Sequence, residues 1–421
     1  MRWRTMLALL CALLLVAPSC LAFSDTAAAL DAADSLTLTL NGLKVTQLNG
    51  NDRGREALNS FLSPLAARVA LDKETARLAL LADGAEFASL ALASGEWPDP
   101  GTMPHKALEA VFSEALPALY EACLPVEEPP EPEERSVSIR NLGRSPRRTT
   151  LTVTPEQFAG AETALASLRE CVARLSVHLP HAAELNAWIS ELNAASALTL
   201  KRLEGEDGQA LAWQLTGLIA SGGKDVRKLT LYGGVKGNDA YVSLKLPARS
   251  GKNSLTLTVE LKDKAGAKKN TWTGTVTYKR SMNGEACTCK DTLKLENEHD
   301  GGERITGTLK REYTAGGIKT VWTLTPSLRD DGGGLTGTLT LKKKHAQTQV
   351  WQASLNVSLT AGVEQGESAS GGMAEFSAGT LAYLTRYRDA LPEADRRLLD
   401  HMLRTDAWMN GTAVPAPQSY E

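Results

Sequence analysis

Runs in which apolar and polar residues alternate dominate this chain, and such alternation is typical of strands with one buried face. Between residues 197 and 360 these runs are rich in Leu, Thr, Val, Trp and Lys, and turns such as SGGKD, NEHDGGE and DDGGG interrupt them. The spacing of the turns predicts a long antiparallel meander of roughly ten strands.

The N-terminal part contains runs with the alternation of a strand and runs with the spacing of a helix. LTLTLNGLKVTQL at 36–48 places two alternating runs around Asn41-Gly42, which predicts a β-hairpin because both turn residues tolerate a positive φ. A helix over about 55–66 and a small meander over 68–94, with turns near Asp72 and Asp83-Gly84, should follow. Helical spacing then predicts a helix over about 105–123. Its buried stripe would contain Leu108, Phe112, Ala115, Leu119 and Ala122.

An acidic, proline-rich segment, PVEEPPEPEE at 125–134, predicts a linker, since four prolines fit neither a helix nor a strand ladder. A hairpin is expected after it over 136–154. Thr154, Pro155 and Gln157 then form the pattern of a capping box that starts a helix. This helix would bury Phe158, Leu165, Leu168, Val172 and Leu175. Further helices are predicted over about 182–195, 378–391 and 393–406.

The first 22 residues have the pattern of a secretory signal: the cationic MRWRT, a short apolar run and small residues ending at Ala22. We expect the mature protein to begin at Phe23 and to be secreted, periplasmic or extracellular. Cys20 suggests the alternative of a lipid anchor, but Pro18 and the missing Leu of a lipoprotein signal speak against it. The predicted divisions are a signal peptide (1–22), an N-terminal part (23–124), the linker (125–134), the main sheet part (135–360) and C-terminal helices with a polar tail (361–421).

A repeated Thr-Gly-Thr motif marks three predicted strands: WTGTVT, ITGTLK and LTGTLT, with Gly274, Gly307 and Gly337 at their centres. Strand periodicity puts each Gly on the apolar face and the threonines on the other. A row of missing side chains permits strong curvature, or lets a helix or an apolar ligand approach the backbone. The alternative is that Gly only relieves coiling of the sheet beneath a neighbouring Trp. We take Gly274, Gly307, Gly337, Trp272 and Leu335 as candidate ligand-facing residues.

These elements predict an α+β protein with a large curved antiparallel β-sheet, a half-barrel-like meander with helices packed on its concave face. In organisation the chain resembles the LolA/LppX/RseB-like fold of envelope lipid carriers and sensors. The resemblance rests on a hairpin entering a helix, as LTLTLNGLKV enters REALNSFL, followed by a meander ending in helices. It implies a concave apolar pocket and a lipid-like or peptide ligand. The chain's meander is longer, and its C-terminal helices are an addition.

Four cysteines remain after the predicted cleavage: Cys123, Cys171, Cys287 and Cys289. Cys123 and Cys171 lie at or beside the buried stripes of two helices, so we expect them to pair under oxidising conditions. In a strand, Cys287 and Cys289 share a face near the upper distance limit for a bridge, so a bond between them would be easily reduced. A redox-active pair and simple structural cysteines both remain open.

Charge is nearly balanced overall, with 46 Lys or Arg against 49 Asp or Glu, but residues 224–347 hold 23 basic and 13 acidic residues. Lysines such as Lys268, Lys269, Lys342, Lys343 and Lys344 should lie at turns or on the threonine face. They would protect strand edges from pairing or attract an anionic lipid or cell-wall polymer. Nucleic acid is not an expected partner, because the strands lack a regular interleaving of aromatic and basic residues.

No motif predicts catalysis. Ser221 and Lys224 match S-x-x-K but lie in a predicted turn instead of opening a helix. Glu296, Glu298, His299, Asp300 and Glu303 match no calcium loop and are typical of a solvated loop tip. We therefore expect no enzyme, no cofactor, no metal site and no membrane-spanning segment.

Two functions remain open: binding of an apolar, lipid-like ligand in the concave sheet, and a structural or partner-binding role in the cell envelope without a small-molecule ligand. The partner would be a lipid or other apolar ligand in the first case, and an anionic envelope polymer or a protein in the second.

Overall fold

A computed structural model describes most of the chain after the N-terminal region. The described residues are 35–48, 52–72, 75–93, 108–125, 128–176, 198–221, 225–237, 239–246, 254–282, 285–298, 304–330, 334–346, 349–362, 373–390, 392–393 and 396–397.

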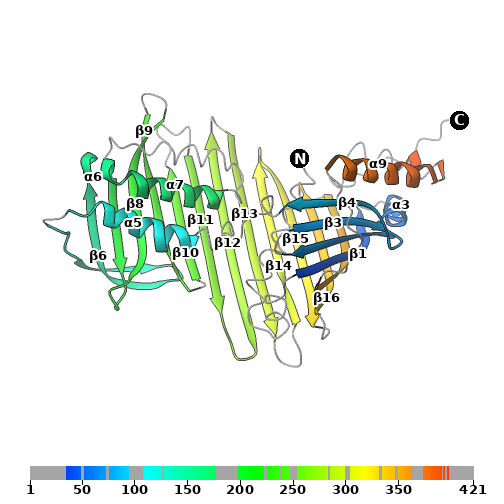
Figure 1. The fold of residues 1–421 in the computed structure, drawn as a ribbon, viewed down its shortest axis with the longest axis horizontal. Coiled ribbons are helices and arrows are strands. Elements are labelled where there is room, and N and C mark those ends of the chain that lie inside the picture. Colours follow the sequence, from blue (N-terminus) through cyan, green and yellow to red (C-terminus); the bar gives the residue numbers. More distant parts are fainter. Residues whose placement is uncertain are drawn as a thin grey trace.

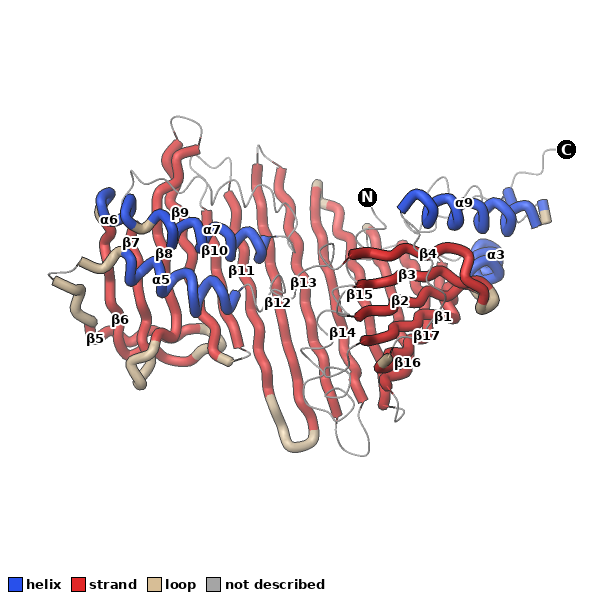
Figure 2. The backbone as a smooth tube through the Cα atoms, viewed as in Figure 1, coloured by secondary structure: helices blue, strands red, loops and turns tan. Residues whose placement is uncertain are grey.

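In the described part of the chain, seventeen strands form one large antiparallel sheet (Figure 1 and Figure 2). The strands from β5 to β17 are neighbours in chain order. β17 then pairs with β1, and the sheet continues through β2 and β3 to β4. The predicted large antiparallel meander is confirmed, and the strands predicted for the N-terminal part join its far end.

The strands are β1 Ser35–Leu48, β2 Leu65–Asp72, β3 Thr75–Ala82, β4 Ala85–Ala93, β5 Glu133–Ile139, β6 Gly143–Val153, β7 Leu198–Glu204, β8 Ala210–Ser221, β9 Asp225–Lys236, β10 Asp239–Leu246, β11 Ser254–Lys264, β12 Lys269–Met282, β13 Glu285–Glu298, β14 Arg304–Ala315, β15 Ile318–Asp330, β16 Gly334–His345 and β17 Gln349–Ala361.

The predicted hairpin around Asn41-Gly42 is wrong, because residues 35–48 form the single strand β1. Gly42 has a φ of 61° and lies where the register against β17 shifts, between Asn41 and Lys44. A positive φ serves a β-bulge as well as a hairpin turn. β1 instead pairs with β17 along one edge and with β2 along the other.

The described helices are α3 Asp52–Leu62, α5 Leu116–Ala122 with a π-helical segment Ala110–Ala115 before it, α6 Pro155–Gly160, α7 Glu162–Ser176 and α9 Met373–Ala390. They confirm the helices predicted near 55–66, 105–123 and 378–391 and the helix after Thr154, which is divided at Ala161. The helix predicted over 182–195 lies outside the described residues, as does most of the one over 393–406.

The capping box predicted at the start of α6 is present. The Thr154 N–H donates to Oε1 of Gln157 at 2.8 Å, and the Gln157 N–H donates to Oγ1 of Thr154 at 3.3 Å. These reciprocal bonds satisfy two backbone donors that the helix cannot pair internally. They end β6 and turn the chain towards α7.

The larger core lies between helices α5 and α7 and one face of the sheet from β6 to β13. Figure 2 shows these helices lying along that part of the sheet. Leu116 and Leu119 of α5 and Leu168 of α7 are at most 1% exposed, and each such buried leucine contributes roughly 1.5–3 kcal/mol. Ala122, expected in the same buried stripe, is exposed. The strand side of this core includes Leu151, Leu200, Leu215, Leu231, Leu244, Leu257 and Tyr278.

A second core lies under α3, where Leu58 packs against β1 and strands β15 to β17. Asn59 of α3 accepts a hydrogen bond from the Val45 N–H at 2.6 Å and donates one to the Val45 carbonyl oxygen at 2.9 Å. The Asn59 side chain therefore pairs with both backbone groups of Val45, as a neighbouring strand would, next to the register shift in β1. At the other edge, Phe87 of β4 stacks on Tyr383 of α9 with ring centroids 4.1 Å apart. Among the described residues, no helix is both long and apolar enough to cross a membrane.

Candidate functional site

The two faces of the sheet differ in chemistry along β11 to β17. Residues paired across neighbouring strands share a face. One row, the centre of what we call the apolar face, runs from Gly274 through Leu293, Leu309 and Leu324 to Leu341. The opposite face, which we call the threonine face, carries the residues between them, among them Thr273, Lys294, Thr308, Thr325 and Thr340.

All five predicted ligand-facing residues belong to the apolar face. Trp272 and Gly307 both pair with Leu295, so they are brought together on either side of it. Gly337 and Leu335 lie on β16, and Gly337 pairs with Leu328. Trp272 is 8% exposed and Leu335 is 1% exposed. Trp272, Leu295, Leu293 and Leu309 form a small cluster of described strand residues, separate from the two helix-covered cores.

Close approach of a neighbouring strand requires glycine at two of the three positions, 307 and 337. A Cβ on Gly307 would lie 2.2 Å from the Lys294 carbonyl oxygen, and one on Gly337 would lie 2.0 Å from the Ser327 carbonyl oxygen. Both obstacles are backbone atoms of the adjacent strand. At Gly274 the nearest atom is a side-chain carbon of Leu261 at 3.1 Å, so this site is less crowded.

Two of the basic groups on the apolar face have a described partner. Arg311 forms a two-bond ion pair with Asp291 at 2.7 Å. These hydrogen bonds raise the pKa of Arg311 above its ordinary value, against the opposing effect of burial. Lys343, expected at a turn or on the threonine face, lies instead on the apolar face and is 7% exposed. Its ammonium is 4.8 Å from the ring centroid of Trp322, where a cation–π contact offsets part of its desolvation.

None of the four described cysteines is in a disulfide. Cys123 and Cys171 belong to the same buried core, so pairing between them under oxidising conditions stays a prediction. Cys289 pairs with Tyr278 and Tyr313 across the sheet. Burial, followed by the nearby Asp291 carboxylate, raises the pKa of Cys289 to about 11. That shift opposes formation of a reactive thiolate.

The threonine face of β11 to β17 is strongly basic. It carries twelve Lys or Arg side chains against four Glu, with Ser and Thr at most of the other positions. The basic residues are Lys262, Lys264, Lys269, Lys279, Lys290, Lys294, Arg304, Lys310, Lys319, Arg329, Lys342 and Lys344, and the acidic ones are Glu260, Glu296, Glu298 and Glu312. No Trp, Tyr or Phe of the described strands β11 to β17 lies on this face.

Two of the glutamates each accept two lysines. Glu296 binds Lys294 at 2.8 Å and Lys269 at 3.0 Å. Glu312 binds Lys319 at 2.8 Å and Lys310 at 2.9 Å, and these bonds lower its pKa to about 2. These two glutamates engage four of the twelve basic side chains, so a positive excess is left over the face.

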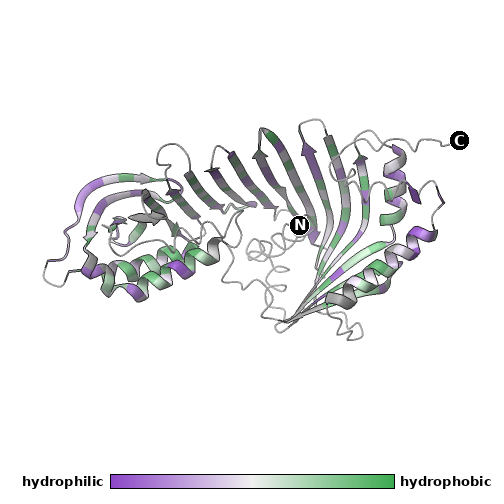
Figure 3. Ribbon diagram, turned by 90° about the horizontal axis from the view of Figure 1, so that it is seen from above, coloured by the Kyte–Doolittle hydropathy of each residue, from purple (hydrophilic) through white to green (hydrophobic). Residues whose placement is uncertain are grey.

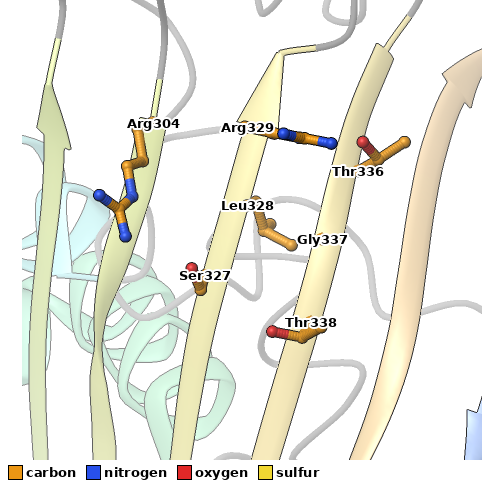
Figure 4. A pocket seen from close by; sticks show the side chains of 7 residues that line it. All are labelled: Arg304, Ser327, Leu328, Arg329, Thr336, Gly337 and Thr338. Carbon is orange, nitrogen blue, oxygen red and sulfur yellow. The ribbon is translucent and has the colours of Figure 1, made fainter.

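A hollow of about 550 Å³ opens at one end of β14, β15 and β16 (Figure 4). We call it the arginine hollow. It is lined by Arg304, Ser327, Leu328, Arg329, Thr336, Gly337 and Thr338. All of these except Leu328 and Gly337 have threonine-face positions in the register. Neither arginine was singled out by the sequence patterns, although the tight turn at Gly316-Gly317 fixes their pairing.

The structure describes only part of the two motifs that the sequence analysis set aside as non-catalytic. Ser221 is the last residue of β8, and Lys224 lies outside the described residues. Glu296 and Glu298 end β13, while residues 299–303 of the acidic run lie outside the described part. Within the described residues, no three His, Cys, Asp or Glu side chains gather as a metal site would require.

Comparison with protein-family models, with curated proteins and with solved structures finds no match to this chain. The resemblance to the LolA/LppX/RseB-like fold therefore stays a prediction.

Proposed function

We propose that this is a non-catalytic binding protein of the cell envelope that binds an anionic polymer through its threonine face. The observation that carries the proposal is the excess of cations on this face, twelve against four acids over seven adjacent strands. Neighbouring strands lie about 4.8 Å apart, so the face presents cations and hydroxyl groups in a regular array. A polymer with repeated negative charges matches such an array.

The chemistry of the face favours a polymer over a bilayer. Proteins that bind membrane surfaces usually insert apolar or aromatic side chains as well as attracting anionic headgroups. The threonine face presents mainly Lys, Ser and Thr, and so offers few side chains that could insert into a bilayer. Nucleic acid remains an unexpected partner, because single-strand binders stack bases on aromatic side chains, and the described strands place none there.

The test is binding of the secreted protein to an anionic polysaccharide, with the uncharged parent polysaccharide as the negative ligand. Lys290→Gln with Lys342→Gln removes two charges from the threonine face, and we expect affinity to fall several-fold. Arg135→Gln with Arg386→Gln removes two charges elsewhere, on β5 and α9, and should change affinity little. Equal losses in both pairs would show attraction by net charge alone and contradict the proposal.

A second candidate function is binding of an apolar, lipid-like ligand on the other face. We infer that this face is concave and that α5 and α7 occupy one half of its curve, which the curl of the ribbon in Figure 3 supports. The favouring observation is the cluster of Trp272, Leu293, Leu295 and Leu309, which lies between the two helix-covered cores. The organisational resemblance to envelope lipid carriers agrees with it.

Mass spectrometry of organic extracts from the purified protein tests this candidate. A bound lipid that is lost in Leu295→Gln, while Thr308→Val on the opposite face retains it, supports the candidate. Extracts without lipid and no uptake of an apolar dye would leave only the polymer proposal.

We also propose secretion with cleavage after Ala22. Intact-mass measurement of the exported protein should give a chain beginning at Phe23. An acylated Cys20 terminus would contradict this.

A further inference from the structure

The arginine hollow differs from the rest of the threonine face in how its charges are paired. Arg304 on β14 lies directly opposite Arg329 on β15. Like charges at directly opposite positions destabilise a sheet. Four lysines of this face instead share glutamates in pairs: Lys310 and Lys319 share Glu312, and Lys269 and Lys294 share Glu296.

Within the described part of the chain, the side chain of neither arginine makes an ion pair or a hydrogen bond, although both residues are in the strand ladder. Glu298, which lies opposite Arg304 on β13, makes no ion pair with it. Figure 4 shows the two side chains splayed apart, with Arg329 reaching over β16 towards Thr336. The sheet therefore holds two like charges at directly opposite positions, and Glu298, across from Arg304 on β13, is the acidic position beside them in the register.

The walls of the hollow add neutral donors. Ser327, Thr336 and Thr338 place three hydroxyl groups around the backbone of Leu328 and Gly337, which pair with each other. Gly337 lets β15 and β16 approach each other closely, because a Cβ at this position would lie 2.0 Å from the Ser327 carbonyl oxygen. The spacing of β15 and β16 at this place is thus set by the backbone.

We propose that the arginine hollow binds a phosphate group of an anionic polymer. Guanidinium groups match phosphate with two parallel hydrogen bonds each, and serine and threonine hydroxyls can donate to the remaining oxygens. A phosphate between Arg304 and Arg329 replaces their mutual repulsion with two attractions. The proposal rests on the proposed function of the threonine face, and it names the charged group that the face recognises.

The experiment measures binding of the whole secreted protein to inorganic phosphate by calorimetry and to polyphosphate by the same method. The first variant is Arg304→Gln with Arg329→Gln. The matched control is Lys342→Gln with Lys344→Gln, which removes two charges from the same face outside the hollow. Arg304→Lys with Arg329→Lys keeps both charges and removes the guanidinium forks.

We expect the affinity for inorganic phosphate to fall at least tenfold in the glutamine variant of the arginines, several-fold in the lysine variant, and less than twofold in the control. The control should still lose affinity for polyphosphate, because its two lysines belong to the threonine face. Phosphate should raise the melting temperature of the wild type and the control only. Without phosphate, Arg329→Gln alone should melt at a slightly higher temperature than the wild type, because the repulsion is relieved. This last readout also shows that the variant folds.

The outcomes separate the two proposals. If both charge-removing pairs weaken polyphosphate binding equally and phosphate binding is unchanged or absent, the face binds polymers but the hollow is not its recognition site. If phosphate binds and only the arginine variant loses it, while no polymer binds the wild type, the hollow stands and the polymer function fails. Binding to phosphatidylglycerol vesicles but not to polyphosphate, lost in the arginine variant, would overturn the polymer as the source of the phosphate.

Discussion

Arg311 on β14 donates two hydrogen bonds of 2.7 Å to the carboxylate of Asp291 on β13, one from Nε and one from Nη2. The side chains are 26% and 33% exposed, on a face that is otherwise mostly apolar. A guanidinium and a carboxylate that meet through two parallel bonds form one of the stronger polar contacts in proteins. Loss of either partner leaves the other charge partly desolvated.

Asp291→Asn should therefore lower the free energy of unfolding by about 2 kcal/mol. The double variant Asp291→Asn with Arg311→Met should recover part of that loss, because it leaves no unpaired charge. Urea unfolding of the wild type, Asp291→Asn, Arg311→Met and the double variant completes a double-mutant cycle. Additive losses would show that the ion pair contributes nothing of its own.

Glu312 predicts a pH dependence. Its hydrogen bonds to Lys319 and Lys310 lower its pKa to about 2, whereas an unfolded glutamate titrates near pH 4.3. Because the folded pKa is the lower one, the stabilisation is complete above about pH 4.3 and is lost as the pH falls towards 2. The pair is near the surface, so the contribution should be below about 1 kcal/mol.

Unfolding measured between pH 2 and 6 tests this contribution. Glu312→Gln should flatten the acid side of the plot of unfolding free energy against pH. The control is Glu298→Gln, because no ion pair in the described residues connects the Glu298 carboxylate to a neighbouring strand. This variant should leave the plot unchanged. Identical acid limbs in the wild type and Glu312→Gln would contradict the prediction.

Local patterns predicted the elements whose determinants lie close together in the chain. Alternation identified the strands of the meander, and Asp83-Gly84 forms the predicted turn with φ values of 51° and 80°. The capping box at Thr154 was read from four consecutive residues. The buried stripe of Leu108, Phe112 and Leu119 followed from helical spacing.

Features that depend on distant partners were not predictable in this way. Asn41-Gly42 has the composition of a hairpin turn, but β1 stays continuous because β17, about 300 residues away, pairs with its whole length. The sequence pattern placed the three glycines on the apolar face, but it did not reveal that a neighbouring backbone approaches Gly307 and Gly337 within the sheet. The Arg304–Arg329 pairing follows from the register that the Gly316-Gly317 turn sets between β14 and β15, and the sequence patterns had not identified that turn.

Gly307→Ala should be strongly destabilising. A methyl group at this position would lie 2.2 Å from the Lys294 carbonyl oxygen and 2.9 Å from the Leu295 Cα, and backbone atoms within a ladder cannot move aside cheaply. We expect a loss of about 3 kcal/mol. Gly274→Ala is the control, since its nearest obstacle is the Leu261 side chain at 3.1 Å, and it should cost less than about 1 kcal/mol. Similar losses in both variants would show that the close backbone contact at Gly307 is not what makes glycine necessary there.

Cys289 should resist alkylation in the folded, reduced protein. Burial and then the Asp291 carboxylate raise its pKa to about 11, so at pH 8 only about a thousandth of it is thiolate, the reactive form. Its side chain is also 3% exposed, whereas Cys287, two residues earlier on the same face, is only half-buried. Iodoacetamide labelling followed by peptide mass spectrometry should therefore modify Cys287 first and leave Cys289 unmodified for at least ten times as long. Labelling in guanidinium chloride, where every cysteine should react, shows that the reagent is competent. Equal native rates at Cys287 and Cys289 would mean that β13 opens to solvent much more readily than its fully paired position between β12 and β14 implies.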